Sequence, residues 1–403
     1  LQGADVAVYG RPPPASQGTL ATPYTAKGRP STRAGQPLAL TRLLLLHWRP
    51  GYVATPASWG PRYCSVGAVE RGAVRLPSLG GSSFLRQLFC LSMRIHITGV
   101  AGVLGSALAR ALTEAGYEVQ GNDVVRREEA WRLSGVDVTY LWKATQDLEF
   151  EDLAGVDVVI DAGIAVADRP LGFSSPLYTA VSNIVPHLRL MELARRMPST
   201  VFVLPSSFNA LYGHGRSKYL ETLLPLPSSV YGWTKAAAEL LYHAYARSYG
   251  VKTVITRVAS SYGPGGRADE LPHKMIIYGL RGRIFVLRSP DAVREWVYIG
   301  DVVAFYRRLL ERLDEAVGKT FHVACTPTGP VKNKELAEAV RREVGLTYVY
   351  GDYEPGETAG GSPISFRPSC RRARELGWRA ATTLEEGIKK TVAWFRENLW
   401  RYA

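Results

Sequence analysis

Three glycines between a strand pattern and a helix pattern constrain the fold of this chain more than any other feature. Alternating apolar residues over 93–98 predict a β-strand, and leucines at every fourth position over 104–112 predict a helix. Gly99, Gly102 and Gly105 join the two at a GxxGxxG spacing. Glycines permit a tight turn, and the free N–H groups at a helix N-terminus attract a pyrophosphate. The pattern therefore predicts a dinucleotide-binding turn.

The residue after the next strand indicates which dinucleotide this turn binds. The helix is expected to end at Gly116, and a second strand, 117–122, leads to Asp123. A carboxylate there accepts hydrogen bonds from the adenosine ribose and repels a 2′-phosphate, which favours NAD over NADP. Arg126 and Arg127 follow closely and could accept that phosphate instead. NAD is the predicted cofactor, with NADP as the open alternative.

Strands and helices continue to alternate after this point. Short apolar strands are predicted at 156–160, 201–204 and 252–256, and the helical stretches between them include 188–197 and 236–249. This alternation is typical of an α/β fold with a doubly wound parallel sheet, the Rossmann architecture.

The predicted sheet divides the chain into three parts. Residues 1–92 are expected to be a disordered extension and 93–256 an NAD-binding Rossmann domain. Residues 257–403 are expected to form mainly a smaller α+β substrate-binding lobe, interleaved with the Rossmann domain. The substrate pocket is expected to be formed by 256–300 and 350–372, and the sequence of these segments does not identify the substrate.

Three pairs of residues are further candidates for cofactor contacts. Val103-Leu104 open the helix after the glycine turn. Asp137-Val138 are expected to follow a short strand and to lie near the adenine. Ala162-Gly163 follow a predicted strand at the carboxyl edge of the sheet, where a dinucleotide crosses such a fold.

The first 92 residues differ in composition from the rest. They hold ten prolines, eleven glycines and no methionine, and they carry +8 of the total charge of +13. Such a composition buries too little apolar surface to offset the entropy of ordering. Three interpretations stay open: upstream DNA translated ahead of a true start at Met93, an Arg- and Ser-rich targeting peptide, or a flexible arm. The remaining 311 residues carry only +5, which gives no reason to expect a nucleic-acid partner.

Cysteine spacing, histidine spacing and apolar runs exclude further classes. The four cysteines form no CxxC pair, so we expect no disulfide framework and a reducing, cytoplasmic compartment. The histidines show no HxxxH spacing, the usual local signature of a zinc site, so no metal is expected. The longest apolar run near the start, 43–46, is far shorter than the roughly 20 residues of a membrane span, so no membrane partner is expected.

Tyr231 and Lys235 are the candidate catalytic pair, since residues four apart share one face of a helix. A tyrosine of ordinary pKa, about 10, is a poor base at neutral pH. A neighbouring ammonium and the positive ring of an oxidised nicotinamide would lower that pKa, so that Tyr231 takes a hydroxyl proton while the adjacent carbon gives up a hydride. Ser206 and Ser207 follow the predicted strand 201–204, and a serine there could hydrogen-bond the reacting oxygen.

Several motifs occur in one order over the 311 residues from Met93. They are Thr98-Gly-Val-Ala-Gly-Val-Leu-Gly105, Asp123, Asp137, Ser206-Ser207, Tyr231-Gly-Trp-Thr-Lys235, Arg257, Tyr262-Gly-Pro-Gly265, Arg294-Glu-Trp-Val-Tyr-Ile-Gly-Asp301 and Glu375-Leu-Gly-Trp378. In this ordered set the chain resembles the NAD-dependent epimerase/dehydratase family, the extended short-chain dehydrogenases/reductases.

The resemblance implies roles for individual residues. It implies catalysis by a Ser or Thr, here Ser207, together with Tyr231 and Lys235. It also implies that Val258 lies near the nicotinamide and that Arg294 contacts a substrate phosphate, which suits a bidentate guanidinium. A homodimer that pairs two helices from each copy is implied as well.

Three departures from the family pattern bear on the substrate. The family usually places its Ser or Thr four residues before the tyrosine of a Tyr-Gly pair, and here Phe208 stands four before Tyr212. Ser207 fills the role only if the loop has one extra residue. Ser260, a candidate substrate contact, stands where nucleotide-sugar enzymes usually have Asn. The Thr-Asp-Glu of 4,6-dehydratases is replaced by Ser207-Phe208-Asn209, which argues against that elimination.

These observations predict an NAD-dependent nucleotide-sugar epimerase with UDP-glucose 4-epimerase-like chemistry. The sugar carbon C4 would be oxidised to a ketone and reduced again on its other face, with NAD staying bound. Two alternatives stay open. One is a dehydrogenase of the same fold that oxidises a sugar or other small alcohol and releases NADH. The other is a noncatalytic NAD-sensing module, against which the intact Tyr231 and Lys235 pair weighs.

Overall fold

A seven-stranded sheet forms the centre of the structure, a computed structural model that describes residues 93–163, 175–215, 218–352 and 367–402. In spatial order its strands are β12 (Thr320–Val323), β7 (Lys252–Val258), β5 (Val201–Ser207), β4 (Val158–Ile160), β1 (Arg94–Thr98), β2 (Glu118–Asp123) and β3 (Thr139–Trp142). Every neighbouring pair is parallel. This order confirms the predicted doubly wound Rossmann sheet.

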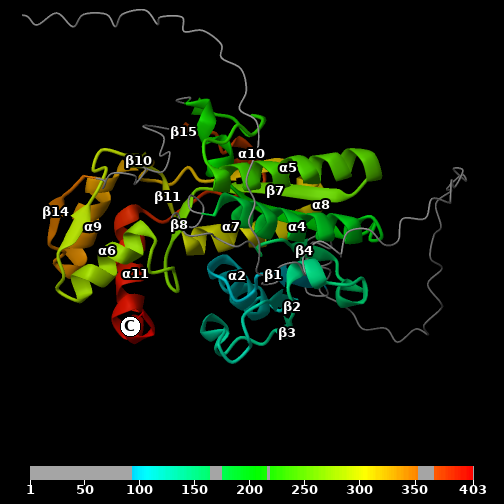
Figure 1. Ribbon diagram of the computed structural model, residues 1–403, viewed down its shortest axis with the longest axis horizontal. Coiled ribbons are helices and arrows are strands. Elements are labelled where there is room, and N and C mark those ends of the chain that lie inside the picture. The colour runs from blue at the N-terminus through cyan, green and yellow to red at the C-terminus, as the bar shows by residue number, and fades with distance from the viewer. Residues whose placement is uncertain (1–92, 164–174, 216–217, 353–366, 403) are drawn as a thin grey trace, which may run out of the picture. The chain divides into compact units, whose positions relative to one another are not determined.

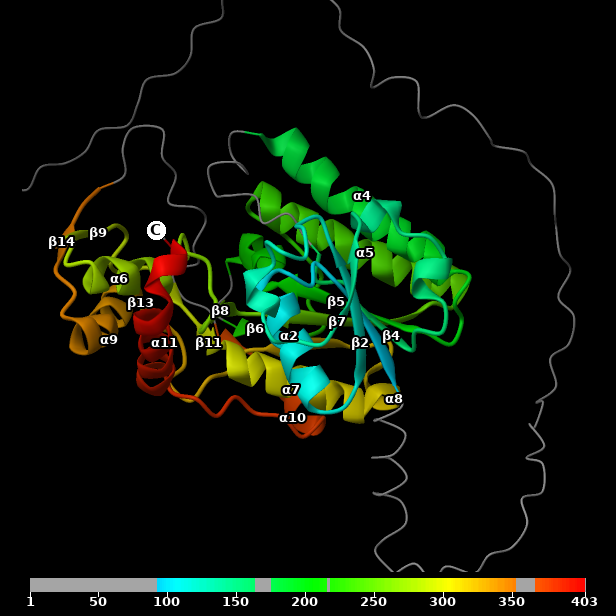
Figure 2. The same cartoon turned by 90° about the horizontal axis from the view of Figure 1, so that it is seen from below.

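Helices cover both faces of this sheet, as Figure 2 shows. On one face lie α2 (Val103–Glu114) and α7 (Ile299–Glu311), and on the other α4 (Pro176–Ala194) and α5 (Val230–Tyr249). Alternate strand residues face opposite layers: Val158 and Ile160 pack in the core beneath α2 and α7, and Val159 packs beneath α4 and α5. Burial on both faces explains why these strands are short, uninterrupted apolar runs.

The two long helices begin earlier than the sequence pattern predicted. The stretch predicted at 188–197 is the end of α4, whose interior contains Pro186. A proline removes one backbone donor from a helix and is a common stop signal, so it hid the first half of α4. The stretch predicted at 236–249 is the end of α5, which begins at Val230 because the Ser229 side chain caps the helix.

A smaller C-terminal lobe has its own core beside the sheet (Figure 1). Its helices are α6 (Leu271–Leu280), α9 (Asn333–Val344) and α11 (Leu384–Asn398). Its strands form three pairs: β8 (Ser260–Tyr262) with β11 (Trp296–Tyr298), β9 (Phe285–Leu287) with β14 (Tyr348–Tyr350), and β10 (Val293–Arg294) with β13 (Val331–Lys332). The remaining elements are α8 (Leu313–Ala316), α10 (Arg371–Glu375) and the pair β6 (Lys218–Tyr219) and β15 (Arg367–Pro368). Both α7 and β12 come from the second half of the chain and pack with the sheet.

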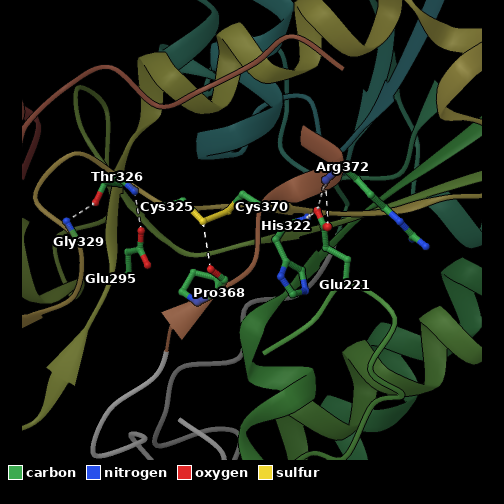
Figure 3. Close-up of a disulfide and its surroundings, with 9 residues drawn as sticks. All are labelled: Glu221, Glu295, His322, Cys325, Thr326, Gly329, Pro368, Cys370 and Arg372. Atoms are coloured by element: carbon green, nitrogen blue, oxygen red, sulfur yellow. Dashed lines mark hydrogen bonds between the residues drawn. A yellow bond between two sulfur atoms is a disulfide. The ribbon is translucent and has the colours of Figure 1, made fainter. Parts of the chain in front are cut away.

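A disulfide joins Cys325, just after β12, to Cys370, just after β15 (Figure 3). The expectation of no disulfide framework did not foresee this bond. The two residues are 45 apart in sequence, with 6.3 Å between their Cα atoms, and only the fold brings them together. The expectation of a reducing compartment, which rested on unpaired cysteines, loses that support.

Three further expectations concern a membrane span, a metal site and the first segment. Among the described helices, none is long and apolar enough to cross a membrane. Within the same residues, no group of three or more His, Cys, Asp or Glu side chains is placed to hold a metal ion. The predicted extension, 1–92, lies outside the described residues.

Candidate active site

The glycine turn lies at the carboxyl end of β1, where the order of the strands reverses between β1 and β4. Gly99 has a φ of 61°, and a Cβ built on it would lie 2.6 Å from the Cα of Gly163. A Cβ on Gly105 would overlap the carbonyl oxygen of Gly99. Side chains at these positions would fill the turn, so the glycines leave a cradle lined by backbone.

This cradle fits the pyrophosphate of NAD. Helix α2 begins at Val103 after Gly102, which provides no side-chain cap, and its first turn carries no acidic residue. The backbone N–H groups of that turn, which includes Leu104, are therefore free to donate to an anion, and the helix dipole favours negative charge there. Ala162 and Gly163 close the other side of the cradle at the end of β4.

Asp123 lies beside the glycine turn as predicted from its place at the end of β2. Its carboxylate accepts hydrogen bonds from the N–H groups of Ala101, at 3.0 Å, and Val125, at 3.1 Å. These bonds hold the carboxylate at the carboxyl edge of the sheet, and its remaining lone pairs can accept from ribose hydroxyls.

The two arginines after Asp123 each make a contact of their own. The Arg127 guanidinium donates to the carbonyl oxygens of Leu133 and Val136, at 3.2 and 3.3 Å. The Arg126 guanidinium lies 5.0 Å from the ring centroid of Trp142. Trp142 is paired with Asp123 between β2 and β3, so the Arg126 guanidinium stays in the neighbourhood of that carboxylate.

Asp137 and Val138 are not where the sequence analysis expected them. They precede β3 instead of following a strand, and Asp137 is exposed, its carbonyl accepting from the hydroxyl of Thr113 near the end of α2. They therefore lie at the amino end of β3, opposite to the edge that holds Asp123, and the predicted placement beside the adenine is wrong. Residues 143–145 follow the carboxyl end of β3. The sequence analysis missed this strand because it is an edge strand without apolar alternation.

Tyr231 and Lys235 lie in the first two turns of α5. The hydroxyl of Ser229 accepts from the N–H of Gly232 at 3.0 Å and so fixes the start of the helix. Lys235 is buried, and its Nζ donates to the carbonyl oxygen of Pro205 at 2.8 Å. Burial lowers the pKa of Lys235 to about 8, although the negative charges of Asp161 and Glu239 oppose that shift. Tyr231 lies one turn away and is half-buried.

Ser207 ends β5 and supplies the hydroxyl at this edge of the sheet. Its Oγ accepts from the backbone N–H of Asn209, at 3.2 Å, and from that residue's side-chain amide, at 3.0 Å. Phe208 is buried, with its ring 4.7 Å from that of His322, so it is part of the core. A Cβ on Gly232 would overlap the carbonyl oxygen of Asn209. The loop after Ser207 and the turn that carries Tyr231 are thus packed together.

Ser206, the neighbouring serine, belongs to a buried cluster instead. Its Oγ donates to Glu239 at 2.5 Å, and the Arg257 guanidinium binds the same carboxylate with its closest contact at 2.7 Å. All three side chains are buried. The cluster ties α5 to the ends of β5 and β7, which makes Ser206 and Arg257 structural residues.

The candidate substrate residues lie where the sheet meets the C-terminal lobe. Val258 ends β7 opposite Ser207. Ser260 begins β8, where it pairs with Trp296, and Arg294 stands two residues before that tryptophan. The strand pairing therefore brings Ser260 and the segment of Arg294 together, beyond the nicotinamide end of the predicted cofactor path.

A buried polar cluster next to the glycine turn was not foreseen. Asp161, His187 and Tyr242 are fully buried, and His187 and Tyr242 are each hydrogen-bonded to Asp161. Asp161 directly precedes Ala162 and could have been noticed as an acid at the end of an apolar strand. His187 gave no signal, because it lies before the stretch of α4 whose helical period was visible.

The chain is similar to several nucleotide-sugar enzymes. The model of the NAD-dependent epimerase/dehydratase family matches residues 95–324, more than half of the chain. The dTDP-glucose 4,6-dehydratase of Mycobacterium tuberculosis is 28% identical over 334 residues, which cover 77% of this chain and 96% of that protein. A putative UDP-glucose 4-epimerase of Methanocaldococcus jannaschii is 26% identical over 326 residues, covering 75% and 99%. The structure of the Thermotoga maritima UDP-glucose 4-epimerase with UDP-glucose aligns with a TM-score of 0.68 at 26% identity, covering 76% of this chain and all of that one.

Proposed function

The chain belongs to the NAD-dependent epimerase/dehydratase family, and from this we propose that it is a nucleotide-sugar 4-epimerase with UDP-glucose 4-epimerase-like chemistry. The observation that carries the proposal is the arrangement at the carboxyl edge of the sheet. There the loop of Ser207 packs against the turn of Tyr231, and Lys235 is anchored behind them.

In the proposed reaction, NAD supplies a reversible acceptor for the hydride of the sugar carbon. Ser207 donates a hydrogen bond to the C4 oxygen and orients the sugar. Tyr231 takes the proton of the C4 hydroxyl and later returns it to the same oxygen. The Lys235 ammonium stabilises the tyrosinate by its charge. Arg294 binds a phosphate of the nucleotide, and Ser260 contacts the substrate beside it.

The side chains after Ser207 favour epimerisation over 4,6-dehydration. Elimination of water from the sugar needs an additional acid and base beside the tyrosine. Phe208 is a core residue, and Asn209 carries a neutral amide that does not titrate. Relatives of both kinds match this chain at similar identity, so these two positions support the choice.

The test is the variant Tyr231→Phe, with Tyr249→Phe at the exposed end of the same helix as the matched control. Loss of a general base lowers turnover by about 10²–10⁴-fold, whereas bound NAD, measured after its release by denaturation, stays at the level of the unchanged protein. Near-normal turnover of Tyr231→Phe refutes the mechanism. With UDP-glucose, accumulation of NADH identifies a dehydrogenase, and a 4-keto-6-deoxy sugar identifies a dehydratase.

We also propose that two copies pair through α4 and α5. These helices pack side by side on one face of the sheet (Figure 1). Their outer surface is apolar at helical spacing, with the exposed residues Leu177, Val181, Val185 and Leu188 on α4 and Trp233 and Leu240 on α5. An exposed apolar surface of this kind favours burial against a second copy, which gives a four-helix interface.

A further inference from the structure

Asp161 is a fully buried carboxylate at the end of β4, directly behind the candidate active site. Its Oδ1 accepts from the hydroxyl of Thr98 at 3.1 Å. Its Oδ2 accepts from the hydroxyl of Tyr242 at 2.6 Å and lies 2.5 Å from Nδ1 of His187. Burial raises the pKa of Asp161, but the electrostatic effect of His187, the bonds from His187 and Tyr242 and the Lys235 charge together lower it, so the carboxylate is ionised. The contacts with Thr98, His187 and Tyr242 fix the position of this buried carboxylate.

The cluster is bonded directly to the glycine turn. The Thr98 hydroxyl that donates to Asp161 also accepts from the N–H of Gly163 at 2.7 Å. Thr98 immediately precedes Gly99, and Gly99 has no room for a Cβ against Gly163. A chain of hydrogen bonds from Asp161 through Thr98 to Gly163 thus sets the spacing of the two strand ends that form the cradle.

The same carboxylate acts on the candidate catalytic lysine. Its negative charge favours the ammonium form of buried Lys235, as does that of Glu239 on α5. Glu239 already shares a buried ion pair with Arg257 of β7.

We propose that Asp161 is a positioning residue: through the hydroxyl of Thr98, its carboxylate sets the spacing of the two strand ends that form the cofactor cradle. His187 and Tyr242 hold Asp161 in place. This proposal concerns the binding of the cofactor and does not rest on the choice of reaction.

The hydrogen-bond chain is tested with Thr98→Val, which keeps the shape of the side chain and removes the bridging hydroxyl. Equilibrium dialysis of the full chain against NAD is expected to show binding about tenfold weaker, since two buried hydrogen bonds are lost. Thr98→Ser, which keeps the hydroxyl, is expected to restore it. Unchanged affinity in Thr98→Val overturns this part, and it does so whether or not the protein epimerises a sugar.

The carboxylate is tested with Asp161→Asn and, as the matched control, Asp157→Asn at the opposite end of β4, where the carboxylate accepts from the N–H of Arg94. Equilibrium dialysis is expected to show NAD binding about tenfold weaker in Asp161→Asn, because the anchor of Thr98 is lost, and unchanged in Asp157→Asn. The losses in Asp161→Asn and Thr98→Val should not add in the double variant, because both act through one hydrogen bond. Unchanged NAD affinity in Asp161→Asn, or additive losses in the double variant, overturns the proposal.

Changing one partner of a buried, hydrogen-bonded carboxylate can prevent folding. The double variant Asp161→Asn with His187→Asn replaces both by neutral amides and serves if the single variant does not fold. It is expected to show the same weakening of NAD binding, and unchanged NAD affinity in a folded double variant likewise overturns the proposal. A wild-type protein without epimerase activity refutes the proposed function and leaves the comparison of NAD affinities to decide on the turn.

Discussion

The Nζ atom of Lys235 donates a hydrogen bond to the backbone carbonyl oxygen of Pro205 at 2.8 Å. This bond anchors the buried ammonium at the end of β5, two residues before Ser207 and one helical turn from Tyr231. The fold therefore fixes the position of the ammonium that the proposed chemistry requires before any substrate binds. At this position, burial lowers the pKa of Lys235.

The first prediction concerns pH. Burial lowers the pKa of Lys235 to about 8, so the ammonium is charged below that pH and neutral above it. We expect kcat/KM to fall as the pH rises through about 8, because the tyrosinate loses its stabilising charge. An arginine stays charged at every accessible pH, so residual activity of Lys235→Arg should lack this fall. An equal fall in Lys235→Arg would assign it to another group.

The second prediction concerns the cradle. In Gly105→Ala the new methyl group overlaps backbone atoms of Gly99 and Val100, and we expect the protein to lose most of its bound NAD. Gly135→Ala is the control, because Gly135 also has a positive φ, 71°, but no atoms lie within 4 Å of its Cβ position. The control should lose only about 1 kcal/mol of stability and keep NAD. NAD retention in Gly105→Ala would show that the cofactor does not need this close approach.

The third prediction concerns the choice of dinucleotide. Replacement of Asp123 by serine removes the charge that repels a 2′-phosphate, so the preference for NAD over NADP should fall by at least about tenfold. The Arg126→Ala variant should leave NAD affinity unchanged, since this guanidinium lies over Trp142. Competition binding with the two dinucleotides measures both effects. An unaltered preference in Asp123→Ser would exclude this carboxylate as its cause.

Much of this site follows from local patterns, and the parts that do not have identifiable physical reasons. The glycine turn and Asp123 were predictable because a strand, a turn and a helix are consecutive in sequence. The strand β3 was missed because it is an edge strand with no apolar alternation, which misplaced Asp137. The Asp161 and His187 pair joins residues 26 apart on different elements, and such a contact leaves no periodic trace.

The fourth prediction concerns the disulfide, which the sequence also did not reveal. It closes a loop of 45 residues, so Cys370→Ser should lower the free energy of unfolding by about 2–4 kcal/mol. Cys325 has a φ of 59°, which glycine adopts without strain. Cys325→Gly should therefore lose about 1 kcal/mol less than Cys325→Ala. Denaturant unfolding with and without a reductant measures these values. Equal losses in the two Cys325 variants would contradict the argument from backbone conformation.

The fifth prediction concerns the proposed dimer. A charge in the centre of the exposed face of α4, as in Val181→Glu, should convert the dimer to a monomer in sedimentation measurements. Ile284→Glu, an equally exposed apolar position in the C-terminal lobe, is the control and should leave the dimer intact. If both variants sediment as the unchanged protein does, the face of α4 and α5 is not the interface.

The path of the hydrogen on C4 tests the central claim most directly. The protein is incubated with UDP-glucose deuterated at C4, and the products are examined by proton NMR and for NADH. An epimerase that uses Tyr231 and Lys235 as proposed yields UDP-galactose with the deuterium still on C4. Deuterium on C6 of a 4-keto-6-deoxy sugar, or in released NADH, would contradict it.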